Sequence, residues 1–326
     1  MKETIRTIKT FICFYVTLPL FVLALLLSGL SVSGYQKAEA APSVNKENKA
    51  SEIINKSTSP ITSEISQNSG YAIVKRDLSK DYNILNSTDE KIDEEELLLR
   101  PLSYNYIESV PLVLVIHTHA TESYTDSSQS FTTPDSEGNY GFYDNSTATR
   151  SNDTSKNMIA IGEVFSEVLS EKGIGVIQCR TLNDFDDYNN AYSNSRKMIE
   201  DYLKKFPTIK YIVDIHRDSL QSESGEKTKA LASELKNCAQ VMFVNGTLFD
   251  NWESNLSLAL KIKEVMDKDY PSLSRPIYLR KAKYNLDLTK ASLLLEVGTC
   301  ANTLEEAKKG AKLSAECFAK VIKQES

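Results

Sequence analysis

The chain of 326 residues contains only three histidines, His117, His119 and His216, and two of them lie in one short motif. His119 and Glu122 have the H-x-x-E spacing, and His216 could complete a set of three metal ligands. Two imidazoles and one carboxylate suit a catalytic zinc ion, which takes three protein ligands and keeps a fourth position open for water. H-x-x-E alone is a common spacing, so the prediction of a zinc site depends on whether these residues meet in space.

Two of the histidines compete for one ligand position. Residues two apart in an extended segment point to the same side, so His117 and His119 could both face a metal. We favour His119 as the ligand because it shares the H-x-x-E step with Glu122. His117 is then either the alternative ligand, a group that supports a ligand, or a donor to the transition state.

Charged residues flank His216. Asp214 and Asp218 lie two positions to either side of it, and either could orient the imidazole ring. We keep Asp218 as an alternative metal ligand and expect Asp214 to be an ordinary strand residue. Arg217 is a candidate to hold a substrate carboxylate with two parallel hydrogen bonds, and a structural ion pair is the alternative. Arg150 is a second candidate for the same binding role.

Glu296 is the candidate catalytic residue. It stands in the otherwise apolar run Ser292–Gly298, where an ionisable group is costly to bury. Zinc lowers the pKa of a bound water towards ~7 and polarises a carbonyl oxygen, and a nearby carboxylate can take the proton and pass it to a leaving amine. Glu296 suits this role, and a salt bridge to a neighbouring lysine or arginine is the structural alternative.

Alternating strands and helices must position these residues. Short apolar runs are typical of strands buried on both faces, and a 3.6-residue apolar period is typical of helices. The patterns predict strands over 111–116, 174–179, 209–215, 239–244 and 292–297, an extended segment over 277–282, and helices over 155–172, 189–206, 255–265 and 304–323. Such alternation indicates an α/β fold with a mostly parallel sheet and helices on both faces.

The candidate residues follow the carboxyl ends of the predicted strands, or lie near them. Ligands of open α/β sheets bind beyond these ends. His117 directly follows the strand over 111–116, His216 follows the strand over 209–215, and Glu296 lies near the end of the strand over 292–297. We therefore expect all three histidines and Glu296 to converge at one edge of the sheet.

The N-terminal segment predicts an exported chain. An uncharged apolar run over 11–30 follows basic residues, and about 20 apolar residues cross the hydrocarbon core as a helix. The basic flank stays on the cytoplasmic side. We expect residues 1–30 to be a cytoplasmic flank and single-pass anchor in the cell membrane, with the catalytic domain extracytoplasmic. The alternative is a cleaved signal peptide, because Ala38–Ala40 resembles a cleavage site.

The chain after the anchor changes composition near residue 105. Residues 31–105 are rich in Ser, Asn, Lys and Glu, which predicts a flexible extracytoplasmic tether with a short helix near Glu94–Leu99. Residues 106–326 then form the zinc-dependent catalytic α/β domain. Within it, the long polar stretch Thr125–Asn152 is either a substrate-binding loop or a mobile surface insertion.

Charge and cysteine content exclude several classes of protein. The 38 basic and 44 acidic residues give a net charge of −6, so the chain has no general basic character for binding nucleic acid. The five cysteines form no C-x-x-C pair, which excludes a zinc ribbon and a thioredoxin motif. We expect most of the exported cysteines to be buried free thiols.

Three motifs carry a resemblance to a known family. They are 117–124 (HTHATESY), 214–218 (DIHRD) and 296–298 (EVG), behind a single N-terminal apolar segment. In this combination the chain, from about Leu112 to its C-terminus, closely resembles the stage II sporulation protein P family of membrane-anchored cell-wall hydrolases in endospore formers. The resemblance implies His119, Glu122 and His216 as zinc ligands and Glu296 as the catalytic residue.

The same resemblance implies a fold and a reaction. It implies the phosphorylase/hydrolase-like α/β fold and zinc-dependent N-acetylmuramoyl-L-alanine amidase activity on peptidoglycan, with endopeptidase cleavage of peptide cross-links also associated with the family. Stage II sporulation proteins D and M are the implied partners, during engulfment. The chain lacks the Gly-rich segment that amidases of the broader group carry around the first histidine. Two other functions stay open: a zinc carboxypeptidase acting on stem peptides, and a non-catalytic, metal-stabilised scaffold for wall enzymes.

Overall fold

A computed structural model describes residues 71–125, 131–134, 140–144, 149–185, 187–223 and 225–324. All of these residues belong to one compact unit, Glu47–Ser326. The predicted membrane anchor over residues 11–30 and the first part of the predicted tether, residues 31–70, lie outside the described residues. Among the residues that are described, no helix combines the length and apolar character needed to cross a bilayer.

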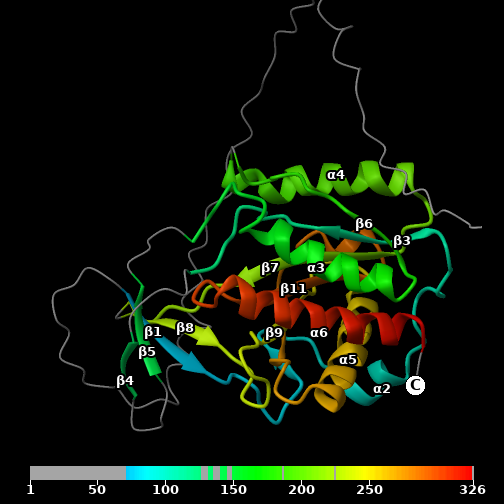
Figure 1. The fold of residues 1–326 in the computed structure, drawn as a ribbon. Helices are drawn as coiled ribbons and strands as arrows, with labels where there is room; N and C mark the ends of the chain where they lie inside the picture. Colours follow the sequence, from blue (N-terminus) through cyan, green and yellow to red (C-terminus); the bar gives the residue numbers. More distant parts are fainter. Residues whose placement is uncertain are drawn as a thin grey trace, which may run out of the picture. The chain divides into compact units, whose positions relative to one another are not determined.

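A seven-stranded sheet forms the centre of the fold (Figure 1), with the order β2-β10-β9-β11-β7-β3-β6. Its strands are β2 Ile84–Asn86, β3 Pro111–Ile116, β6 Gly175–Gln178, β7 Tyr211–Asp218, β9 Val241–Gly246, β10 Ile277–Arg280 and β11 Ser292–Thr299. Every neighbouring pair is parallel except β9 and β11, which run antiparallel. The predicted mixed α/β fold with a mostly parallel sheet is confirmed.

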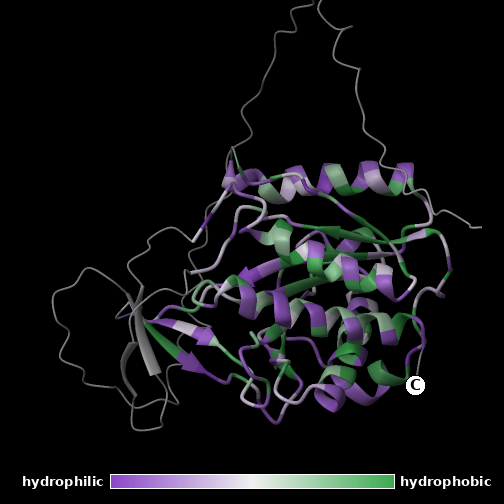
Figure 2. Cartoon of the chain, in the orientation of Figure 1, coloured by the Kyte–Doolittle hydropathy of each residue, from purple (hydrophilic) through white to green (hydrophobic). Residues whose placement is uncertain are grey.

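Helices cover both faces of this sheet. They are α2 Glu94–Leu99, α3 Met158–Glu171, α4 Ala191–Lys205, α5 Trp252–Asp269 and α6 Leu304–Ile322, with 3₁₀ turns η1 Tyr188–Asn190 and η2 Leu286–Leu288. Side chains alternate along β3, so Val113 and Val115 pack in the core with α3, α5 and α6. Leu114 and Ile116 pack on the opposite face with Ile199 of α4. Figure 2 shows the resulting hydrophobic colour along the strands of the central sheet.

A second, four-stranded sheet has the order β4-β5-β1-β8. Its strands are β1 Tyr71–Arg76, β4 Phe131–Pro134, β5 Tyr140–Asp144 and β8 Lys227–Ala230. Strands β4 and β5 lie inside the stretch 125–152, which the sequence predicted as a loop. The described parts of that stretch therefore include a paired hairpin.

The predicted tether is wrong for residues 71–105. Strand β1 pairs with β8, and β2 pairs with β10 at the edge of the central sheet. Helix α2 forms where the short helix was predicted, and its Leu97 is buried in the main core. A few apolar side chains in a polar background are enough here, because the rest of the domain already supplies the surface that buries them.

The predicted strand and helix centres hold, and local signals set their ends. Asn157 caps α3 by accepting a hydrogen bond from the backbone N–H of Ile159. Gly173 follows α3 with φ of +77°, a conformation that glycine adopts readily, so it stops the helix as predicted. The four cysteines of the described chain are all buried free thiols, as expected: Cys179, Cys238, Cys300 and Cys317.

Candidate metal centre

His119, Glu122 and His216 come together at the carboxyl ends of β3 and β7. One ligand atom from each residue lies within 4.8 Å of the others. Nδ1 of His119 is 3.9 Å from Oε1 of Glu122, and Nδ1 of His216 is 3.6 Å from Oε2 of Glu122. A tetrahedral zinc with bonds of about 2.0–2.1 Å holds its ligand atoms roughly 3.3 Å apart. The donor types and spacing therefore fit zinc after small side-chain movements.

The turn that follows β3 places His119 beside Glu122. Strand β3 ends at Ile116, and the backbone N–H of Glu122 then donates a 3.1 Å hydrogen bond to the carbonyl of His119. This turn brings the two side chains of the H-x-x-E motif to one place. The backbone N–H of Arg217 donates to Oε2 of Glu122 at 3.3 Å, so β7 fixes the carboxylate as well as supplying His216.

His117 points elsewhere, and its surroundings differ from those of the cluster. Its Nδ1 lies 3.2 Å from the carbonyl of Ile215, and its Nε2 lies 3.2 Å from Nε2 of Gln178. Gly162 of α3 lies against the ring, where a Cβ would come within 2.4 Å of Nε2. Burial lowers the pKa of His117 to about 4. Of the two histidines that could have faced the metal, only the favoured His119 joins the cluster, because strand β3 ends at Ile116 and the extended segment stops before His119.

Asp214 is more than the ordinary strand residue that the sequence predicted. The side chain lies on the same face of β7 as His216, and its Oδ1 is 3.1 Å from Nε2 of that ring. Thr118 holds the carboxylate with its backbone N–H at 2.9 Å and its hydroxyl at 2.6 Å. Asp214 therefore lies at ion-pair distance behind the ring, in the position from which carboxylates orient metal-binding histidines.

Asp218 is occupied differently. Its Oδ2 accepts a 2.7 Å hydrogen bond from Nη1 of the buried Arg275, and its Oδ1 accepts from the backbone N–H of Ser219. It does not belong to the cluster of candidate ligands. The described contacts make Asp218 the partner of Arg275.

The charges around His216 favour a cation at this place. Burial disfavours the charged imidazole, but the Asp214 and Glu122 carboxylates raise the pKa of His216 well above its usual value. Burial and the neighbouring His216 lower the pKa of His119 to about 4. Although burial opposes it, Arg217 and the histidines lower the pKa of Glu122 to about 2. Two carboxylates therefore lie beside the His216 ring, and either a proton on that ring or a metal ion bound to it supplies the compensating positive charge.

Glu296 lies next to this cluster on the neighbouring strand. It is the register partner of His216 in the parallel pair of β11 and β7. Its Oε2 is buried without a hydrogen-bond partner among the described residues. Burial, followed by the charge of Asp218, raises the pKa of Glu296 to about 8. A carboxyl with a buried, unused oxygen beside a candidate metal centre is suited to move a proton.

The two arginine candidates already hold carboxylates. Nη1 of Arg217 lies 3.8 Å from Oε1 of Glu122. The same guanidinium donates through Nε to the carbonyl of Ser123 and through Nη2 to the carbonyl of Thr149. Arg150 donates to Asp184 at 2.8 Å. The contacts of Arg217 are those of the structural ion pair that the sequence left open.

Two tyrosines next to the ligands were missed from the sequence. The ring of Tyr188 stacks on His119 with centroids 4.5 Å apart, and the ring of Tyr192 packs edge-on against it at 5.5 Å. Tyr192 also stacks on His216 at 6.4 Å. One turn separates the two tyrosines, so their i, i+4 spacing at the start of the predicted helix was the available signal.

The chain is similar to one known protein family over most of its length. The family model of stage II sporulation protein P matches residues 27–319, which include every candidate site residue. The chain belongs to the stage II sporulation protein P family. The stage II sporulation protein P of Bacillus subtilis is 31% identical over 221 residues, which cover 64% of this chain and 51% of that protein. The chain thus spans about half the length of this curated family member.

Solved structures with similarity to this family member include two amidases. N-acetylmuramoyl-L-alanine amidase AmiC2 of Nostoc punctiforme is 16% identical, with 65% of this chain and 96% of that chain covered and a TM-score of 0.36. The CwlD amidase of Clostridioides difficile, solved in complex with the GerS lipoprotein, is 12% identical, with 65% and 97% covered and a TM-score of 0.38. Such low identities and scores assign no activity to the family member described here.

Proposed function

We propose that this chain is a zinc-dependent N-acetylmuramoyl-L-alanine amidase that cleaves peptidoglycan during engulfment in sporulation. Membership of the stage II sporulation protein P family supports the biological setting. The observation that carries the chemistry is the cluster of the half-buried His119 with the buried Glu122 and His216, with Glu296 beside it. An exported, single-pass protein of the cell membrane, held by residues 1–30, is part of the same proposal.

The residues of the site have distinct roles in this proposal. His119, Glu122 and His216 hold the ion, which when bound supplies a Lewis acid and lowers the pKa of water. Asp214 keeps the His216 ring in place from behind. Glu296 takes a proton from the attacking water and delivers it to the nitrogen of L-alanine as the amide bond breaks.

Burial gives the carboxyl of Glu296 a raised pKa that suits both proton transfers. A group with its pKa raised towards neutrality both accepts and releases a proton readily near neutral pH. A cation at the neighbouring cluster would favour the ionised form, which is the form that accepts the first proton. The unused Oε2 atom is available for that transfer.

A zinc carboxypeptidase is less well supported. Such an enzyme needs a cationic clamp for the terminal carboxylate of its substrate. The two candidate clamps, Arg217 and Arg150, are engaged with Glu122 and Asp184.

Endopeptidase cleavage of cross-links, and partnership with stage II sporulation proteins D and M, belong to the proposal through the family alone. The GerS lipoprotein bound to the CwlD amidase gives an example of an amidase with a protein partner.

Replacement of Glu296 tests the proposed chemistry. Glu296→Gln keeps the size of the side chain and removes its ability to carry a proton, so zinc content should stay near one ion per chain while release of stem peptides from purified sacculi is lost. Glu167→Gln, on the exposed surface of α3, is the matched control and should retain release. Undiminished release by the Glu296→Gln variant would remove Glu296 from the mechanism. No release of stem peptides by the unaltered chain or by either variant would favour the alternative of a non-catalytic scaffold for wall enzymes.

A further inference from the structure

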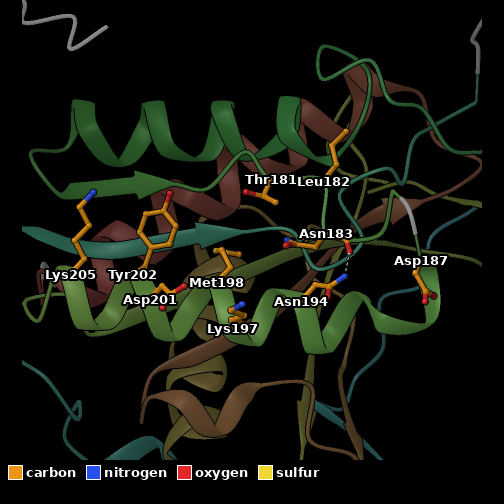
Figure 3. A pocket seen from close by; sticks show the side chains of 10 residues that line it. All are labelled: Thr181, Leu182, Asn183, Asp187, Asn194, Lys197, Met198, Asp201, Tyr202 and Lys205. Carbon is orange, nitrogen blue, oxygen red and sulfur yellow. Dashed lines mark hydrogen bonds between the residues drawn. The ribbon is translucent and has the colours of Figure 1, made fainter. Parts of the chain in front are cut away.

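A groove of about 550 Å³ lies outside the metal centre, between α4 and the loop that follows β6. Figure 3 shows the α4 side chains along one side of the groove, with Asn194 reaching Asn183 of the loop at one end and Tyr202 and Lys205 at the other. Its walls are formed by Thr181, Leu182, Asn183, Asp187, Asn194, Lys197, Met198, Asp201, Tyr202 and Lys205. Its volume falls within the range of about 300–1,000 Å³ that is usual for ligand sites.

One end of the groove adjoins the candidate metal centre. Asp187 lines the groove and also caps η1, whose first residue Tyr188 stacks on His119 at 4.5 Å. Asn183 lines the groove and donates through Nδ2 to the carbonyl of His117 at 2.9 Å. A polymer that leaves the groove at the Asp187 end would therefore reach the tyrosine that packs on His119.

The groove is preformed by packing between the helix and the loop. Nδ2 of Asn194 donates to the carbonyl of Asn183 at 3.0 Å, which ties α4 to the loop. Ile199 and Tyr202 pack α4 onto the central sheet. The α4 residues that line the groove run from Asn194 to Lys205, roughly 17 Å at 1.5 Å per residue, so the groove is elongated along the helix.

The chemistry of the walls suits a neutral, hydroxyl-rich polymer. Two lysines, Lys197 and Lys205, are matched by two aspartates, Asp187 and Asp201, so the walls carry no net charge. Amide and hydroxyl groups offer hydrogen bonds, and Met198 and Tyr202 are among the apolar contacts. An acidic peptide would gain little from such walls, because each favourable lysine is offset by an aspartate.

Exposed aromatic rings mark the end nearest the metal centre. Phe185 and Tyr188 stand on either side of the wall residue Asp187, and they are 55% and 49% exposed. Neither ring lines the groove, but both belong to the segment that forms its end, and exposed apolar side chains are often part of ligand-binding surfaces. Tyr188 already stacks on His119 and has the Arg150 guanidinium 4.3 Å from its ring centroid, so Phe185 is the ring that provides an apolar face on which a sugar ring can lie.

We propose that this groove binds the glycan strand of peptidoglycan and thereby leads the muramoyl amide to the metal centre. The inference rests on the proposed amidase function, since it identifies the part of the same substrate that lies outside the reacting bond. It predicts that the chain recognises glycan without any stem peptide attached.

Binding of peptide-free glycan tests the groove directly. The probe is a set of purified glycan strands stripped of their stem peptides, titrated against the full-length chain and measured by calorimetry. Asn194→Ala combined with Lys197→Ala should weaken binding at least tenfold, because both wall side chains are lost. Ser193→Ala combined with Lys204→Ala changes exposed α4 residues that do not line the groove, and should bind within twofold of the unaltered chain.

The outcomes separate the groove from the amidase proposal. Circular dichroism verifies that both double variants fold, and free stem peptides are titrated in parallel. Equal glycan affinity for the two double variants, no glycan binding at all, or groove-dependent binding of free stem peptides alone would overturn the inference. Groove-dependent glycan binding by a chain that does not hydrolyse sacculi would support the groove and count against the amidase.

Discussion

Asp214→Asn tests whether the buried carboxylate behind His216 sets the metal affinity of the site. The substitution preserves size but removes the negative charge 3.1 Å from Nε2 of His216. The amide oxygen of Asn can still accept from the backbone N–H of Thr118, and its NH₂ group can donate to the Thr118 hydroxyl, which accepts as well as donates. The substitution therefore removes the charge beside His216 while both contacts to Thr118 remain possible.

The expected loss follows from the position of Asp214 behind a ligand. Removal of a carboxylate that orients a metal-binding histidine costs 10- to 100-fold in metal affinity or activity. At about 1.4 kcal/mol for each factor of ten, this is a loss of roughly 1.4–2.8 kcal/mol in zinc binding. The burial of Asp214, which is 2% exposed, places the expectation in the upper half of that range because solvent does not screen the pair.

Competition with a chromophoric chelator measures the zinc affinity. Asp218→Asn is the matched control: it lies on the same strand, also two residues from His216, but its carboxylate pairs with Arg275. That variant should lose stability, because it leaves a buried guanidinium unpaired, yet its folded fraction should bind zinc within about threefold of the unaltered chain. A loss below threefold in Asp214→Asn, or an equal loss in both variants, would refute the reasoning.

Three further predictions concern the fold around the site. Gly162→Ala should destabilise the chain by about 1 kcal/mol in urea unfolding. The new Cβ would lie 2.4 Å from His117 and 2.5 Å from Gln178, and this overpacking outweighs the helix preference for alanine. A more stable variant would contradict this packing. Ser166→Ala should stabilise α3 by roughly 1 kcal/mol in the same assay, since the Ser166 hydroxyl is buried without a partner among the described residues, and a loss of stability would show that the hydroxyl is satisfied. Zinc at a hundredfold excess over its Kd should raise the free energy of unfolding by about 2.7 kcal/mol, and the melting temperature with it. An equal rise in His119→Ala would locate the bound zinc elsewhere.

Much of the central fold could be predicted because its strands are short apolar runs. The strand over 111–116 and the helix over 304–323 agree with β3 and α6 to within a residue at each end. β8, of sequence KTKA, has no apolar pattern, and it forms because β1 pairs with it. Pairing between distant segments leaves little trace in a single sequence, so the second sheet was missed.

The candidate site was predictable where residue type alone restricted the choice. With three histidines, a carboxylate at H-x-x-E spacing and Glu296 in an apolar strand, the chain offered few other ways to build a zinc site. The sequence offered both Asp214 and Asp218 as residues that could orient His216 and favoured an ordinary strand role for Asp214, because the choice depends on the Thr118 donors of a neighbouring strand end. The position of His117 depends equally on where β3 ends, which periodicity does not fix to the residue.

Mass spectrometry of digested peptidoglycan tests the central claim most directly. Purified sacculi are incubated with the full-length chain, once with zinc and once with excess chelator, and the soluble products are identified. The account predicts stem peptides with a new free N-terminal alanine and glycan with intact lactyl groups in the zinc sample, and neither in the chelator sample. The account would be contradicted by stem peptides that have lost only terminal residues or by cleavage at another bond alone. Equal release in the zinc and chelator samples would contradict it as well.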